Sequence, residues 1–208
     1  MKHHIIKSLS AYAMVFLSIG AASAQENTKK FEFGCNIGMT TFTNYSGISL
    51  FQDATDSYSN WSEAIHLGYR INNSLFGIQF QYSILNTSAI ALNETAIWWN
   101  TSLMLRHYIP IGGNWETLLG LKFGFSVMAN GFEYLGDNYS RTRLGIDGEF
   151  ETGILYRFNS GNYVGFRAAF NVSGSHFDKD LNLPAGLVSN DKRTFGGYSL
   201  MLQYGLSF

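Results

Sequence analysis

The feature that most constrains this chain is an alternation of apolar and polar residues that recurs from residue 31 onward. In the final stretch, SLMLQYGLSF (residues 199–208), every second position is apolar: Leu200, Leu202, Tyr204, Leu206 and Phe208. Successive side chains of a β-strand point to opposite faces of the sheet, so this pattern predicts strands with one apolar and one polar face. The chain is therefore expected to be all-β.

Eight such segments can be read along the chain, and each reaches the length of about 9 to 11 residues that a tilted transmembrane strand needs. They are residues 31–42, 61–71, 75–84, 96–108, 115–127, 143–157, 163–173 and 199–208. No apolar run after Gly20 approaches the length of a transmembrane helix, whereas 17 Phe, 12 Tyr and 22 Gly with only 14% charged residues favour strands. The pattern predicts an eight-stranded antiparallel up-and-down transmembrane β-barrel.

The connections between these segments alternate in length. Short turns are expected near residues 72, 110 and 158, and longer polar loops at about 43–60, 85–95, 128–142 and 174–192. In outer-membrane barrels the short turns are periplasmic and the long loops extracellular. Pro110 and Pro184 are both expected in connections, because proline cannot donate to a closed ladder.

The N-terminus has the pattern of a secretory signal peptide over residues 1–24, followed by a barrel domain over residues 25–208. Lys2 and Lys7 precede an apolar stretch (residues 9–20), and Ala22-Ser23-Ala24 provides a small-residue cleavage site. The alternative is a transmembrane anchor, but the apolar stretch is shorter than the roughly 20 residues that a spanning helix requires.

The remaining composition excludes several function classes. Asp and Glu outnumber Lys and Arg, which disfavours a nucleic-acid partner. The single cysteine, Cys35, rules out an internal disulfide. No metal site is expected, because His66 and His107 lie on separate strands without a ligand at usable spacing. No cofactor is predicted.

A soluble, lipocalin-like cup is the architectural alternative, because its apolar residues would alternate in the same way but face inward. The polar face of the predicted strands argues against it, since it is rich in Gly, Ser, Asn and Gln with isolated charges. Aromatic residues near the strand ends also suit two membrane-interface girdles. These are Trp61, Trp99 and Tyr198 toward the loops, and Tyr69, Trp115 and Tyr156 toward the turns.

The terminal Phe208, preceded by Tyr204, Leu206 and Leu202 in alternation, resembles the C-terminal signature of bacterial outer-membrane proteins. The chain as a whole resembles the small OmpA-like and OmpX-like barrels and, more loosely, the PorT-like barrels of Bacteroidetes. This resemblance implies an integral protein of the bacterial outer membrane, a monomer surrounded by lipid. It also implies that the barrel-assembly machinery recognises the C-terminal strand.

Two groups of charged residues are expected to point into the barrel. The first is a lumenal ion-pair network, and the second lies toward the periplasmic turns. Their members are Lys122, Asp147, Glu149, Glu151 and Arg167 for the network, and Glu32, Arg70, Arg106 and Arg157 for the turn end. Charges in a narrow interior must be paired, which favours a plug over a conducting path, and mutual neutralisation over capture of a periplasmic anion.

The remaining candidates lie toward the predicted loops. Ser175, His176 and Asp178 have the residue types of an acyl-transfer site, and small outer-membrane barrels include lipid A deacylases and palmitoyl transferases. Adjacent Ser and His on an extended chain point to opposite sides, however, which disfavours catalysis. The first loop mixes aromatics with Ser, Asn and Asp, a composition suited to recognition of an extracellular ligand or surface. The sequence thus favours a non-enzymatic barrel with a structural or loop-binding role; the alternatives are a narrow small-solute channel and a lipid A-modifying enzyme.

Overall fold

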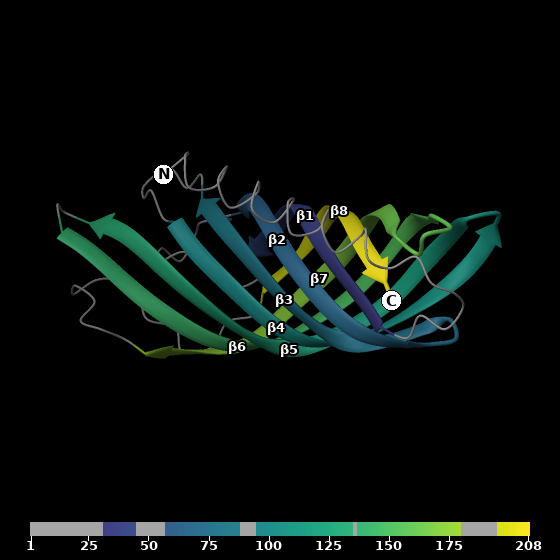
Figure 1. Cartoon of the computed structure of the whole chain (residues 1–208). Helices are drawn as coiled ribbons and strands as arrows, with labels where there is room; N and C mark the ends of the chain where they lie inside the picture. The colour runs from purple at the N-terminus through teal and green to yellow at the C-terminus, as the bar shows by residue number, and fades with distance from the viewer. Residues whose placement is uncertain (1–30, 45–56, 88–94, 135–136, 180–194) are drawn as a thin grey trace.

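Eight antiparallel strands close into one barrel in the computed structural model, which describes residues 31–44, 57–87, 95–134, 137–179 and 195–208 (Figure 1). The strands are β1 (Phe31–Asn44), β2 (Ser57–Ile71), β3 (Ser74–Thr87), β4 (Thr95–Gly112), β5 (Trp115–Tyr134), β6 (Asp137–Arg157), β7 (Tyr163–Lys179) and β8 (Phe195–Ser207). Each strand pairs with the next, and β8 pairs with β1, which confirms the predicted fold class. No helix in the described part of the chain is long and apolar enough to cross a membrane.

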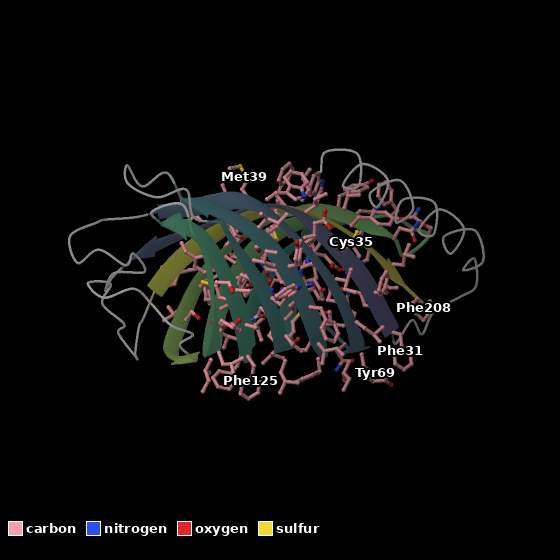
Figure 2. All side chains as sticks on the ribbon, turned by 90° about the vertical axis from the view of Figure 1, so that its left-hand side faces the viewer. Phe31, Cys35, Met39, Tyr69, Phe125 and Phe208 are labelled. Carbon is pink, nitrogen blue, oxygen red and sulfur yellow. The ribbon has the colours of Figure 1, made fainter. Side chains whose placement is uncertain are left out.

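The apolar face of the strands points out of the barrel. Leu103, Phe125 and Phe166 are 68%, 69% and 66% exposed, whereas polar residues of the alternate positions are buried. Figure 2 shows Met39 and Phe125 projecting away from the barrel wall. A soluble cup would bury these side chains, so the lipocalin-like alternative is wrong. A continuous apolar outer face is what a barrel surrounded by hydrocarbon requires.

Aromatic side chains stand toward both ends of this outer face. On the loop side Trp61, Trp99 and Tyr198 are 42%, 45% and 55% exposed, and the Trp99 ring lies 5.9 Å from that of Tyr82. At the turns the exposed Trp115 packs edge to face on Tyr156, with ring centroids 5.1 Å apart. Amphipathic rings at these heights suit the two membrane interfaces.

The turns are short, but the strands run further than the alternation predicts at the opposite end. The β2–β3 turn is two residues long, with Asn72 at φ 55°, and β4 and β5 are separated by Gly113 and Asn114. The expected loop at 128–142 is wrong: β5 continues to Tyr134 and β6 begins at Asp137, because the two strands keep pairing as far as Tyr134 and Asp137. The other predicted loops are also too long, because residues 43–44, 57–60, 85–87, 95 and 174–179 belong to strands. Residues 45–56, 88–94 and 180–192 of these loops lie outside the described residues, as does the predicted signal peptide.

Pro110 lies inside β4 rather than in a connection. It falls near the end of the strand, where the pairing with β5 shifts register between Pro110 and Gly112. A proline is tolerated there because an irregular strand end requires fewer ladder hydrogen bonds. Pro184 lies outside the described residues.

The barrel closes where β1 and β8 meet at the turn end. The N–H groups of Phe31 and Phe208 each donate to the carbonyl oxygen of the other at 2.9 Å. Their rings stack at 6.3 Å, and Tyr69 packs edge to face on Phe31 at 5.2 Å, so these side chains gather at one end in Figure 2. Leu206 shares their alternation but is only 2% exposed, beside the β6–β7 turn.

Candidate functional site

A layer of charged side chains crosses the interior of the barrel. It consists of Arg106 on β4, Lys122 on β5, Glu149 and Glu151 on β6, and Arg167 on β7, named here the central ion cluster. Lys122 pairs directly with Glu149 in the strand register, so their alternation brings both side chains into the interior at the same height. Their charged atoms, Lys122 Nζ and Glu149 Oε1, are 2.5 Å apart.

Glu151 is the centre of this cluster and is completely buried. Its Oε1 accepts from Arg106 Nε at 2.6 Å, and its Oε2 lies 2.8 Å from both Lys122 Nζ and Arg167 Nη1. Arg167 also contacts Glu149 Oε1 at 3.2 Å. A carboxylate removed from water is tolerated only with such compensation. Through these contacts Glu151 connects β6 with β4, β5 and β7.

Asp147 was expected in the same network but is held differently. It lies two residues closer to the loop end than Glu149, opposite Ser173. Its carboxylate accepts from Asn100 Nδ2 at 2.7 Å and from the Ser173 hydroxyl. Asp147 therefore belongs to a layer of hydroxyl and amide groups above the central ion cluster.

Arg106 was expected with the turn-end charges, but its guanidinium contacts Glu151 of the central ion cluster. Arg106 pairs in register with Gly120, and an added Cβ on Gly120 would collide with the Glu151 side chain. The missing side chain at Gly120 leaves the space in which the Arg106 guanidinium meets Glu151. Its Nη1 also donates to His66 Nε2 at 3.1 Å.

The remaining turn-end residues converge on Glu32, which is fully buried on β1. Glu32 Oε1 accepts from the hydroxyls of Tyr108 at 2.5 Å and Tyr163 at 2.9 Å. Arg157 Nη2 lies 3.6 Å and Arg70 Nη1 4.0 Å from Glu32 Oε2. These two arginines also lie over tyrosine rings, Arg70 4.6 Å from the centroid of Tyr108 and Arg157 4.9 Å from that of Tyr163.

Glu116 on β5 is a member of the turn-end group that the sequence reasoning missed. Its carboxylate lies 3.3 Å from Arg70 and 2.9 Å from Arg157. The signal was present in the alternation, because Glu116 shares its parity with Leu118, which is buried.

A group of buried, mostly apolar side chains, named here the apolar layer, fills the lumen beside the turn-end charges, and His66 connects the two charged groups, 3.1 Å from Arg106 Nη1 and 3.8 Å from Glu32 Oε1. The apolar layer is formed by buried side chains that fill the lumen between the strands: Leu75, Met104, Tyr108, Leu118, Leu155 and Tyr163. On the loop side of the central ion cluster, Phe42 and Trp98 pack edge to face with centroids 5.1 Å apart. Side chains therefore fill the described interior on both sides of the central ion cluster.

A small cavity lies between the Phe42–Trp98 pair and the central ion cluster. Its volume is about 10 Å³, at the lower limit for holding one water molecule. The wall includes Ser102, Asp147 and Asn171 besides the rings.

The two described histidines lie on opposite faces of the barrel wall, and the acyl-transfer candidates belong to β7. His66 lies in the lumen, 3.0 Å from the Tyr163 hydroxyl, while His107 is exposed on the outer face and contacts Ser74. Among the described residues, no group of three or more His, Cys, Asp or Glu side chains is arranged so that it could hold a metal ion. Ser175, His176 and Asp178 fall on β7, but their side chains are not among those described.

Comparison with known proteins places this architecture in one family. The family described as "Outer membrane protein beta-barrel domain" matches residues 10–204. The fold is similar to that of Neisserial surface protein A, with a TM-score of 0.59 and 14% identity over 88% of this chain and 100% of that one.

A second solved structure is the solid-state NMR structure of AlkL in lipid bilayers. It has a TM-score of 0.51 and 10% identity, over 90% of this chain and 94% of that one. No curated protein sequence matches. These results do not distinguish a PorT-like subfamily, which stays a prediction. The lipid-facing apolar surface, the closed ladder and the match over nearly the whole sequence agree: this chain is an integral bacterial outer-membrane protein that belongs to the outer membrane protein beta-barrel domain family.

Proposed function

We propose that the protein is a non-enzymatic barrel without a continuous aqueous pore, and that it acts through structural support of the outer membrane or through contacts made by its extracellular loops. In this proposal the turns face the periplasm and the longer connections face outward. The barrel-assembly machinery and outer-membrane lipids are its general partners. A monomer is expected, because a closed ladder leaves no strand edge for another copy to pair with.

The observation that carries the proposal is the filled interior. Eight strands enclose a space that side chains can fill completely. Here the central ion cluster crosses that space, with the apolar layer on one side and the Phe42–Trp98 pair on the other. An ion crossing the lumen would have to separate pairs such as Lys122–Glu149 and Arg106–Glu151, which lie 2.5 and 2.6 Å apart.

The interior charges also balance among the described side chains. Each of the five cationic residues contacts at least one carboxylate, and with Asp147, which accepts from Asn100, the two signs are equal in number: Arg70, Arg106, Lys122, Arg157 and Arg167 against Glu32, Glu116, Asp147, Glu149 and Glu151. A balanced interior lacks the excess of one sign that a selective ion pathway uses. It supports mutual neutralisation over a basic ring that attracts anions.

The channel alternative is tested by conductance. The refolded protein, checked by a heat-modifiable gel band, is added to planar bilayers beside an outer-membrane porin as positive control. The expected result is no discrete single-channel current under conditions in which the porin conducts. Regular unitary currents that change in the variant Lys122→Met would contradict the closed interior.

The loop-binding version rests on the composition of the segment TNYSGISLFQDATDSYSNW (residues 43–61), which mixes aromatics with Ser, Asn and Asp and whose two ends belong to β1 and β2. Such surfaces combine large contact area with adaptable hydrogen bonding. Deletion of residues 46–55 is expected to leave the folded band intact while reducing adhesion of cells that carry the barrel to host or matrix surfaces. Adhesion equal to that of the full-length protein would favour the purely structural role.

A further inference from the structure

We propose that a patch on the outer face of the barrel binds the ammonium headgroup of an aminolipid, in the leaflet on the loop side of the membrane. The patch, named here the Glu63 surface, consists of Trp61 and Glu63 on β2, Tyr82 on β3 and Trp99 on β4. This inference goes beyond the proposed function, because it assigns a class of lipid to a defined place on the barrel wall. It does not depend on what the loops contact.

The four side chains of the Glu63 surface are neighbours in the ladder. Glu63 pairs in register with Tyr82, and Tyr82 pairs with Trp99, so the three lie side by side on adjacent strands and on the same face. Trp61 is on that face two residues further along β2 toward the loops. It pairs in register with Met39, which projects from the outer wall in Figure 2. The surface is therefore continuous and lies at the loop-side aromatic belt.

Glu63 places a negative charge on the lipid-facing side of the wall. The Trp61 indole N–H donates to its Oε1 at 3.2 Å. The ion pairs that the structure describes join residues of the interior and of the turn end, so no described cation neutralises Glu63. A charge that faces lipid costs less free energy near the membrane interface than at its centre. A positively charged headgroup is the interfacial group that complements this carboxylate.

The aromatic rings beside Glu63 favour an ammonium group over a metal ion. The Tyr82 and Trp99 rings lie 5.9 Å apart, and Trp99 is 45% exposed. The faces of such rings attract ammonium groups, and tryptophan does so most strongly. A divalent metal ion needs several oxygen ligands, whereas this surface offers one carboxylate. An ammonium group can use both the carboxylate and the neighbouring rings.

The apolar neighbours of the surface indicate that the ammonium group belongs to a lipid. Toward the middle of the barrel, the next outward residues are Ile65 and Phe80, which pair in register and are 42% and 46% exposed. A lipid whose headgroup lies at Glu63 places its acyl chains along these apolar side chains. A water-soluble amine would lack this second contact.

The test is NMR of the refolded barrel in micelles of a neutral maltoside detergent, with ¹⁵N-labelled tryptophan. The Trp61 indole signal, assigned by its absence in Trp61→Phe, reports on the surface because this N–H donates to Glu63. Titration with dihexanoylphosphatidylethanolamine is expected to shift this signal until it saturates. Dihexanoylphosphatidylglycerol, which has the same chains but no ammonium group, is expected to give no saturating shift. The Trp115 signal, from the turn end, is expected to stay in place with both lipids.

A conservative variant separates the charge of Glu63 from its shape. In Glu63→Gln the amide oxygen can still accept from Trp61, but the negative charge is gone, so the apparent dissociation constant for the ethanolamine lipid is expected to rise about tenfold. The control Glu116→Gln, which removes a carboxylate at the turn end, is expected to bind the lipid like the wild type.

The wild-type titrations can overturn the proposal without any variant. An equal response of the Trp61 signal to both lipids, or no saturating response to either, would contradict an ammonium site. A saturating response to magnesium chloride without lipid would contradict the choice of an ammonium group over a metal ion. Unchanged affinity in a folded Glu63→Gln barrel would show that the carboxylate does not bind the headgroup.

Discussion

Replacing Glu151 with glutamine is the sharpest perturbation of the barrel interior. Glu151→Gln keeps the size of the side chain but removes the negative charge that faces Arg106, Lys122 and Arg167 at 2.6 to 2.8 Å. Glu149 is then the remaining carboxylate of the central ion cluster for three cations. Removing one partner of a buried ion pair typically costs about 3 to 5 kcal/mol, because the other charge stays buried without compensation. We expect a loss in this range in the free energy of unfolding.

The assay is denaturant unfolding in phospholipid vesicles, followed by tryptophan fluorescence and by the heat-modifiable gel band. Glu116→Gln is the matched control, because it removes a carboxylate that also contacts two arginines but lies 14% exposed at the turn end. We expect it to cost closer to the ~1 kcal/mol of a solvent-accessible pair.

A double variant separates loss of charge from loss of packing. Lys122→Met removes one of the excess cations, so Glu151→Gln combined with Lys122→Met is expected to be less destabilised than the sum of the two single variants. A Glu151→Gln barrel that unfolds within about 1 kcal/mol of the wild type would refute the reasoning that these charges are buried and mutually dependent.

Three further predictions concern the wall, the seam and the enzyme alternative. Gly124→Ala is expected to cost about 1 to 3 kcal/mol in denaturant unfolding, because its Cβ would collide with the backbone of Thr101 and Ser102. Gly148→Ala, whose Cβ has no atom within 4 Å, should be neutral. Equal losses of unfolding free energy in the two variants would contradict this account of the packing. Phe208→Ala should slow the appearance of the folded gel band and cost about 1 kcal/mol in unfolding free energy, because it removes the stacking on Phe31 that accompanies barrel closure. The lipid-facing Phe125→Ala should fold at the wild-type rate. Equal slowing in both variants would argue against a special role of the junction between β1 and β8. His176→Ala and deletion of the gene should leave the lipid A mass spectrum unchanged, whereas a shift in acyl composition in both strains would overturn the non-enzymatic proposal.

The alternation in the sequence predicts which face of the barrel a residue occupies, and it does so well. The interior positions of Lys122, Glu149, Glu151 and Arg167 follow from counting by two along each strand. The number of strands follows from the same count, because each alternating segment ends at residues that favour turns.

The height of a residue in the lumen, and the atoms that it reaches, could not be read in this way. Height depends on the register between neighbouring strands, and reach depends on the space that facing residues leave. Arg106 meets Glu151 because Gly120 has no side chain, and Asp147 meets Ser173 because of the β6–β7 register. Neither relation is visible within a single strand.

The ends of β5 and β6 at this hairpin could not be predicted from the sequence for a different reason. Asn130 and Gly131 have the composition of a turn, yet they pair with Arg141 and Ser140 in a hairpin that continues to Tyr134. Pairing with a neighbouring strand can extend a strand through residues of low intrinsic propensity, because cross-strand contacts outweigh that propensity.

The pairing between β1 and β8 sets the order in which the barrel can form. Seven of the eight junctions join strands that follow one another along the chain, so each can form as a local hairpin. The junction between Phe31 and Phe208 instead joins the two ends of the described chain, and the entropy lost in closing a loop grows with its length. Until it forms, β1 and β8 each present an unpaired edge, whose N–H and C=O groups are costly in hydrocarbon. Closure of this last junction and passage into the membrane interior are therefore expected to occur together, as a single cooperative event.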